Sequence, residues 1–246
     1  MIRKEERSLK DIVNITYLYN SGFVVEMDKY ALVFDYYMDK TNYLSKLCQK
    51  YDNVYFFVSH SHFDHWNPAI GEFAQYVRKY FLSYDIHNRN SLPQEKTVVL
   101  DEYDEYKDDT IDVKSYSSTD AGISFLVSIG GWKIFHAGDF NWWHWKGDTK
   151  QNNAFARNGF VKQMKKIAGL KADIAFFPVD RRLEECCDWG VKEFCRQTDV
   201  DNLIAMHNAD RQPWPLQPDF AGADKHIKVW SPVHPGETKR IEKLEK

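Results

Sequence analysis

Four metal-binding side chains gather within a few residues near position 60, directly behind an apolar run. The run, residues 54–58, has the length and composition of a buried strand. Side chains alternate between the two faces of a strand, so the chain has to leave the sheet after Val58 for the next ones to converge. Those side chains are His60, His62, Asp64 and His65. Imidazole and carboxylate groups bind Zn²⁺ readily and leave positions for water, so the sequence predicts a metal site at a strand end.

The alternative for this segment is a histidine-rich surface loop that binds no ion. The spacing H-x-H-x-D-H directly behind a buried strand favours the metal site. Residues 60–65 also resemble the first motif of the metallo-β-lactamase superfamily, which has this spacing at a strand end. The resemblance implies an α+β protein built as a four-layer αββα sandwich, with the metal ions at one edge of the two sheets.

The rest of the chain alternates between strand patterns and a few helices. Aromatic and β-branched residues separated by Gly, Asn and Asp indicate an antiparallel meander over residues 14–37. Further strands are expected at 54–58, 80–83, 97–100, 111–116, 124–129, 132–136, 174–177, 203–206 and 227–230. Helices are expected at 43–49, 69–79, 152–168 and 189–197, the third with Phe155, Phe160, Val161, Met164 and Ile167 facing inward. Two batches of strands with their own helices predict two sheets face to face, with helices outside.

Length and charge limit the classes of protein that the chain can belong to. It has 246 residues and no linker rich in Gly, Ser or Pro, so a single domain over residues 1–246 is expected. A net charge of −3 offers no attraction to nucleic acid or an anionic membrane. The charged start, residues 1–7, lacks a signal peptide, and no apolar run approaches the ~20 residues of a spanning helix. We therefore expect a cytoplasmic protein, and we expect the acidic run at 101–109 to be a solvated connection.

The resemblance implies two further ligands. Asp139 follows Gly138 at a strand end, where the family has an aspartate that bridges two cations. His207 ends the strand at 203–206, where the family supplies its last ligand. Taken alone, these residues would be interpreted as a turn and a core histidine. The set expected at the second cation is Asp64, His65, His207 and the shared Asp139.

The chain departs from the family between residues 116 and 125. Many relatives place a third histidine for the first cation there, whereas this chain has Asp120. Asp120 could supply an oxygen ligand instead, or the first site could bind its metal weakly, or Asp120 could only cap a turn. One or two ions are therefore expected, with Zn²⁺ as the first choice and Mn²⁺ or Fe²⁺ as alternatives.

Residues next to the expected ligands are candidates for the substrate pocket. The aromatic run at 140–145 could form the pocket wall, the core or a subunit interface, and its His144 is a candidate proton donor, ligand or substrate contact. Arg181 or Arg182 could bind an anionic group of the substrate. Asp180 could orient a ligand histidine.

The expected chemistry is hydrolysis. A cation lowers the pKa of its bound water toward ~7, so a metal-bound hydroxide could cleave an ester, lactone or phosphodiester bond of a small molecule. Asp64 is the expected carboxylate that orients this water or accepts its proton. The chain resembles small single-domain hydrolases related to the sugar-phosphate lactonase branch. The alternatives are a metal-binding or sensing protein without turnover, and a nuclease of the same superfamily. The oligomeric state stays open.

Overall fold

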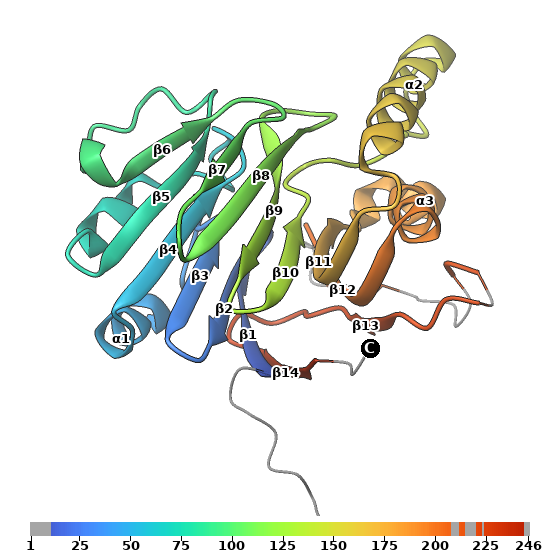
Figure 1. Ribbon diagram of the computed structural model, residues 1–246. Coiled ribbons are helices and arrows are strands. Elements are labelled where there is room, and N and C mark those ends of the chain that lie inside the picture. Colours follow the sequence, from blue (N-terminus) through green and yellow to red (C-terminus); the bar gives the residue numbers. More distant parts are fainter. Residues whose placement is uncertain (1–10, 208–211, 215–219, 223, 244–246) are drawn as a thin grey trace, which may run out of the picture.

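The computed structural model describes residues 11–207, 212–214, 220–222 and 224–243, and two seven-stranded sheets form its body (Figure 1). The strands of the first sheet are β1 (Ile12–Tyr19), β2 (Gly22–Met27), β3 (Tyr30–Phe34), β4 (Asn53–Val58), β5 (Val77–Ser83), β6 (Thr97–Leu100) and β14 (Thr238–Glu242). Their order in space is β14-β1-β2-β3-β4-β5-β6. Pairing is antiparallel from β14 to β3 and parallel from β3 to β6.

The second sheet repeats this plan. Its strands are β7 (Glu105–Lys107), β8 (Ile111–Ser117), β9 (Ile123–Ile129), β10 (Trp132–His136), β11 (Lys171–Pro178), β12 (Asp199–Met206) and β13 (Lys228–Trp230). Pairing is antiparallel from β7 to β10 and parallel from β10 to β13. Each sheet is therefore half antiparallel and half parallel, although the sequence shows no internal repeat.

Helices cover the outer faces of both sheets. The α-helices are α1 (Tyr43–Lys50), α2 (Lys150–Ile167) and α3 (Trp189–Gln197), and short 3-10 helices are η2 (Pro68–Phe73), η3 (Gln94–Lys96) and η4 (Arg181–Cys186). Leu44 and Leu47 of α1 pack into the apolar layer outside the first sheet. Phe194 of α3 stacks on Phe135 of β10, with ring centroids 5.3 Å apart. The expected αββα sandwich is confirmed. Within the described residues, no helix has both the length and the apolar character needed to cross a membrane.

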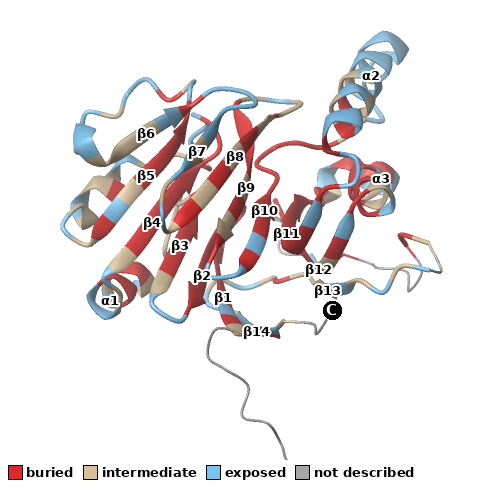
Figure 2. Ribbon diagram, viewed as in Figure 1, coloured by how far each residue is buried: buried red, intermediate tan, exposed pale blue. Residues whose placement is uncertain are grey.

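Large aromatic side chains fill the space between the sheets. Phe23 of β2 lies 4.7 Å from Phe176 of β11, measured between ring centroids, and Phe57 of β4 lies 5.5 Å from Phe125 of β9. All four are fully buried. Buried residues run along the central strands of both sheets in Figure 2. Burying such rings removes a large apolar area from water and holds the sheets in fixed positions.

The helix expected over residues 69–79 is wrong in length and type. The 3-10 helix η2 begins as expected, because the Asn67 side chain accepts a hydrogen bond from the backbone N–H of Ala69. It ends at Phe73, and by Val77 the chain is already in β5. β5 pairs in parallel with a strand on each side, and this pairing outweighs the local helical pattern.

Two other expectations also need correction. Phe155, expected to face inward from α2, is 81% exposed, whereas Phe160 is fully buried. The first turns of α2 project beyond the sandwich, so no apolar surface covers them (Figure 2). The acidic run at 101–109 is mostly exposed, as expected, but it is more than a connection: it includes the short edge strand β7, whose Tyr106 packs against Phe81 at 5.2 Å. Residues 1–7, the charged start, lie outside the described residues.

Candidate metal centre

The predicted ligands follow strands whose carboxyl ends meet at one edge of the sandwich. Residues 60–65 come directly after β4, Asp139 shortly after β10 and His207 directly after β12. All three strands belong to the parallel halves of their sheets. Ligand sites of open sheets lie beyond the carboxyl ends of parallel strands. This topology explains how side chains so distant in the sequence come together.

Six of the predicted ligands form two groups. Within each group the candidate ligand atoms all lie within 4.8 Å of one another. The first group is His60, His62 and Asp139, and the second is Asp64, His65 and His207. Each group therefore offers two imidazoles and one carboxylate, a donor set that suits Zn²⁺, Mn²⁺ or Fe²⁺.

Asp139 lies between the two groups. Its Oδ1 is 3.2 Å from Nε2 of His65, and its Oδ2 is 3.4 Å from Nε2 of His207. The same Oδ2 is 3.7 Å from Nε2 of His60. The carboxylate is thus placed where a ligand shared by two cations would lie.

Two buried atoms at the centre of the cluster have no hydrogen-bond partner among the described residues. They are Nε2 of His65 and Oδ1 of Asp139. The 3.2 Å between them is short, yet the geometry does not make a hydrogen bond. Leaving buried polar atoms unsatisfied is costly, and a bound cation would satisfy both. The residues present therefore fit a divalent metal.

Charges within the cluster shift its pKa values in opposite directions. Burial alone would raise the pKa of Asp139, but the imidazolium groups of His65 and His207 hold it well below its usual range. Burial alone would lower the pKa of His207, but Asp139 and Asp180 raise it to about 9. Burial and the charge of His65 lower the pKa of His60 to about 4. In the metal-free protein at pH 7, His207 therefore carries a proton and His60 does not.

We expect cation binding to weaken as the pH falls below 9. A histidine binds a metal only as the neutral imidazole, so the cation has to displace the proton that His207 holds up to about pH 9. For each proton that the cation displaces, the apparent affinity for the cation falls about tenfold with each pH unit below the pKa of His207. Zinc titration calorimetry in buffers of different ionisation enthalpy measures the number of protons released.

The matched control for this measurement is Asp180→Asn. This change removes a carboxylate that raises the pKa of His207, so fewer protons should be released at pH 7. Zinc affinity that stays constant between pH 6 and pH 8 would contradict the assignment of His207 as a ligand.

Asp35 supports the buried side of the cluster, and the sequence analysis missed it. Its Oδ2 lies 2.7 Å from Nδ1 of His65 and also accepts a hydrogen bond from the Ser59 hydroxyl. Its Oδ1 accepts from the backbone N–H of Ser59. A carboxylate bound to Nδ1 orients the imidazole and leaves Nε2 for the metal. The available signal was a polar residue directly after the buried end of β3.

Two glycines allow the second sheet to approach this support. Gly138 and Gly122 both have positive φ angles, 54° and 65°. A Cβ at Gly138 would lie 2.7 Å from Cβ of Ser59, and one at Gly122 would lie 2.1 Å from the Ser59 carbonyl oxygen. Only glycine permits this conformation and this approach without strain.

Asp180 orients the last ligand, in the role considered for it from the sequence. Its Oδ2 lies 3.0 Å from Nδ1 of His207. Arg182 donates a hydrogen bond from Nε to Oδ1 of the same carboxylate, at 2.9 Å. Burial opposes ionisation, but the hydrogen bonds from His207 and Arg182 lower the pKa of Asp180 to about 2. His207 therefore presents Nε2 to the cluster.

The turn between β1 and β2 forms hydrogen bonds with two members of the second ligand group. Asn20, which is buried with a positive φ, donates a hydrogen bond from Nδ2 to Oδ2 of Asp64 at 2.9 Å. Its carbonyl oxygen accepts from the backbone N–H of His207 at 3.1 Å. The next carbonyl, of Ser21, lies 3.1 Å from Nε2 of His136. His136 thus faces this turn and is not in either ligand group.

Asp120 lies at the exposed rim of the first group. Its Oδ2 is 3.9 Å from Nδ1 of His62, and both side chains are 49% exposed. His60, in contrast, is fully buried. The first group is therefore open to solvent at His62, whereas His65 and His207 of the second group are buried.

The aromatic run after Asp139 divides between the pocket and the core. Trp143 donates a hydrogen bond from Nε1 to the Asp139 carbonyl and packs against His207 at 5.5 Å. Trp142 stacks on Phe160 in the core. The structure does not bring His144 to the cluster: its ring packs 4.8 Å from Trp189 and does not line the cavity above the ligands.

Two cavities open above the ligand groups. The larger, of about 420 Å³, is walled by Thr119, Asp120, Trp143, Trp145, Asn152 and Arg182. The smaller, of about 260 Å³, is walled by Tyr19, Asn20, Tyr37, Phe63, Asp180 and Arg182. Asp64 and His207 line both. Arg181 instead donates a hydrogen bond to the carbonyl of Pro213.

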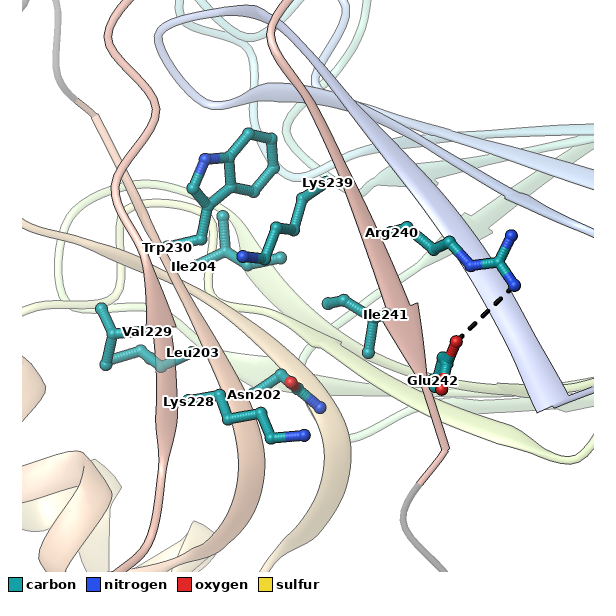
Figure 3. A pocket seen from close by; sticks show the side chains of 10 residues that line it. All are labelled: Asn202, Leu203, Ile204, Lys228, Val229, Trp230, Lys239, Arg240, Ile241 and Glu242. Carbon is teal, nitrogen blue, oxygen red and sulfur yellow. Dashed lines mark ion pairs between the residues drawn. The ribbon is translucent and has the colours of Figure 1, made fainter. Parts of the chain in front are cut away.

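A further cavity, of about 390 Å³, lies between the edge strands β13 and β14 (Figure 3). Lys228, Lys239 and Trp230 line it, and its one carboxylate, Glu242, pairs with Arg240. No histidine lines it, and it lies apart from the ligand groups. It therefore offers no second candidate for a metal centre.

Solved structures with a similar fold include proteins described as a metallo hydrolase and a diiron enzyme. The metallo hydrolase Igni18 from Ignicoccus hospitalis matches with a TM-score of 0.64 and 18% identity, over 94% of this chain and 99% of that chain. The metallo-β-lactamase fold protein YhfI from Bacillus subtilis matches with a TM-score of 0.58 and 12% identity, over 94% and 99%. CmlA, a diiron β-hydroxylase from Streptomyces venezuelae, matches with a TM-score of 0.56 and 11% identity, over 96% and 55%. No protein-family model and no curated protein matches the chain.

Proposed function

We propose that this protein, a chain with the metallo-β-lactamase fold, is a metal-dependent hydrolase that acts on a small molecule. One observation carries the proposal: two groups of ligands share Asp139 and open into cavities large enough for a substrate. Two divalent cations bound there would supply a nucleophilic hydroxide at neutral pH and polarise the scissile bond. His60, His62 and Asp139 would bind one cation, and Asp64, His65 and His207 the other.

Residues that line the cavities would accept the proton, exclude bulk water and bind the substrate. Asp64 lines both cavities, and one of its oxygens is engaged by Asn20, so the other is available to accept the proton of the attacking water. Trp143 covers His207 and limits the access of bulk water. Arg182 is the one Lys or Arg among the residues that line the two cavities, and it could pair with an anionic group of the substrate.

The nature of the bond and of the metal belongs to the same proposal. An ester, lactone or phosphodiester bond fits the chemistry, and the sugar-phosphate lactonase branch stays a prediction from the sequence. Zn²⁺ is the first choice. Mn²⁺ and Fe²⁺ stay alternatives, because both ligand groups contain a carboxylate and because CmlA, with a similar fold, is a diiron enzyme.

A metal-binding protein without turnover is the second candidate. The exposure of His62 and Asp120 favours it, because an open first group could bind its cation too weakly for catalysis. A nuclease is less consistent with the site, since Arg182 is the one Lys or Arg among the described residues that line the two cavities, and a polynucleotide backbone is bound through many basic side chains.

Metal content and hydrolysis measured on the same preparations test the proposal. We expect about two metals per native chain, purified without chelator, and turnover of a phosphodiester or lactone. His62→Ala and Asp120→Ala should each reduce occupancy of the first site, and His207→Ala should reduce occupancy of the second.

Two metals without hydrolysis of either substrate class would favour the binding protein. One metal that does not respond to Asp120→Ala would make the centre mononuclear. A native chain without any metal would overturn both.

A further inference from the structure

The smaller cavity has an aromatic wall beside the second ligand group. Tyr19, Tyr37 and Phe63 form this wall, and Asp64 and His207 of the second group also line the cavity. The rings contact one another in a chain. Tyr37 lies 6.1 Å from Tyr19 and 5.8 Å from Phe63, and the Phe63 ring stands at 79° to that of Tyr37.

Phe63 is held in an exposed position between two ligands. It sits between His62 and Asp64 in the metal-binding turn, and 75% of its surface is accessible. Among the described residues, the other large apolar side chain with comparable exposure is Phe155 on α2, which lines neither cavity. Exposing a phenyl ring to water costs free energy. Covering the Phe63 ring with a flat apolar group would recover this free energy, because a flat group removes the largest area of the ring from water.

The rest of the wall is fixed in place. The backbone carbonyl of Tyr37 accepts a hydrogen bond from Nδ2 of Asn67 at 2.8 Å. The ammonium group of Lys40 lies over the Tyr19 ring, 4.6 Å from its centroid. These contacts restrain the Tyr19 ring and the backbone of Tyr37 before any ligand binds. Binding of an aromatic ring would therefore lose less conformational entropy in the wall.

The two cavities differ in chemistry. Both cavities have aromatic lining, but the larger adds the polar side chains Asp120, Asp148 and Asn152 beside its tryptophans, whereas the smaller exposes more apolar than polar surface. A substrate whose scissile bond lies over the ligand groups would extend into both. Its apolar part would lie on the side of Tyr37 and Phe63, and its polar part on the side of Asp120.

We propose that Tyr19, Tyr37 and Phe63 form a subsite for an aromatic ring of the substrate. The ring would lie in the smaller cavity beside Asp64 and His207, next to the bond that is cleaved. The proposal rests on the proposed metal centre, and it names the substrate class of that same site.

Binding of two product-like acids tests the subsite without any turnover. Phenylphosphonate and methylphosphonate carry the same metal-binding group and differ in the ring. Their dissociation constants are measured by calorimetry on the native chain loaded with Zn²⁺ and on the same chain stripped with chelator. We expect phenylphosphonate to bind the zinc-loaded chain at least about tenfold more tightly than methylphosphonate, a difference of about 1.4 kcal/mol.

Three variants test whether the aromatic wall causes the difference between the two dissociation constants. Phe63→Ala and Tyr37→Ala should each reduce the ratio of the two dissociation constants to below about threefold, by removal of the aromatic contact. Phe155→Ala is the matched control, because it removes an exposed phenyl ring elsewhere and should leave the ratio unchanged.

The outcomes separate the subsite from the proposed function. Phosphonates that bind equally with and without zinc would overturn the metal centre. Zinc-dependent binding of both acids with affinities within twofold of each other would overturn the subsite and leave the metal centre standing. A preference for phenylphosphonate that survives both Phe63→Ala and Tyr37→Ala would place the ring elsewhere.

Discussion

Replacing Asp139 with alanine is expected to lower kcat/KM about 10³-fold or more and to remove at least one metal per chain. Asp139 lies within 3.7 Å of the Nε2 atoms of His60, His65 and His207. Without its charge, two cations would face each other across the cluster with no shared ligand to offset their repulsion. Metal-assisted catalysis contributes several kcal/mol, and each 1.36 kcal/mol is a factor of ten in rate. Metal analysis and steady-state kinetics on the same protein check both effects.

Two further substitutions sharpen this test. Asp139→Asn keeps the shape but removes the charge, so it should resemble Asp139→Ala in metal content. Asp199→Ala removes a carboxylate at the start of β12, far from the cluster along that strand, and should change neither quantity. Full metal content in Asp139→Ala would show that the two ligand groups act independently.

Replacing Asp35 with alanine is expected to cost about 3–5 kcal/mol in the free energy of unfolding, because it leaves buried partners without their carboxylate. Asp35 is fully buried and bonds both His65 and Ser59. We also expect zinc affinity to fall about 10- to 100-fold, since the carboxylate orients a ligand imidazole. Urea unfolding of the chelator-treated protein measures the first effect, and competition with a coloured chelator measures the second.

The effect of Asp35 on stability should depend on pH. Burial works to raise the pKa of Asp35, but the charges of His136 and His65 and the hydrogen bond from His65 hold it below the ordinary value. A lowered pKa stabilises the folded state above the pKa of the unfolded chain, and this stabilisation is lost as the pH falls through the folded value. The difference between the native chain and Asp35→Ala should therefore shrink as the pH falls below about 4.

The isosteric Asp35→Asn separates charge from shape. It should unfold at a urea concentration between those of the native chain and Asp35→Ala. If Asp35→Ala unfolded at the same midpoint urea concentration as the native chain and bound zinc with the same affinity, the supporting role of Asp35 would be contradicted.

The position of the candidate site could be predicted because its residues stand at strand ends. The apolar pattern of residues 54–58 predicts a buried strand, and ligands that follow such a strand have to lie at the edge of the sheet. Asp139 and His207 follow β10 and β12 in the same way, and the structure brings both to residues 60–65. Periodicity predicted that each of these residues stands at a strand end, and the resemblance to the family identified Asp139 and His207 as ligands.

The supporting residues could not be predicted, because their contacts depend on pairing between distant segments. Asp35 looks like an ordinary turn residue until β3 pairs with β4 and Ser59 arrives beside it. Asn20 likewise looks like the tip of a hairpin until its side chain meets Asp64. The role of His144 stays a prediction: Trp143 and Trp145 beside it line the larger cavity, but its own ring packs on Trp189.

The contacts of the Asn20 turn also determine when the cluster can form during protein synthesis. The turn is made early, yet it bonds Asp64 and the backbone of His207, which leaves the ribosome much later. Contacts of such long sequence separation form late in folding. A nascent chain that ends before β12 therefore carries the complete H-x-H-x-D-H motif but lacks His207 and its hydrogen bond to Asn20. The second group can therefore bind its cation with all three ligands only after residue 207 is translated, whereas the first group is complete once Asp139 is present.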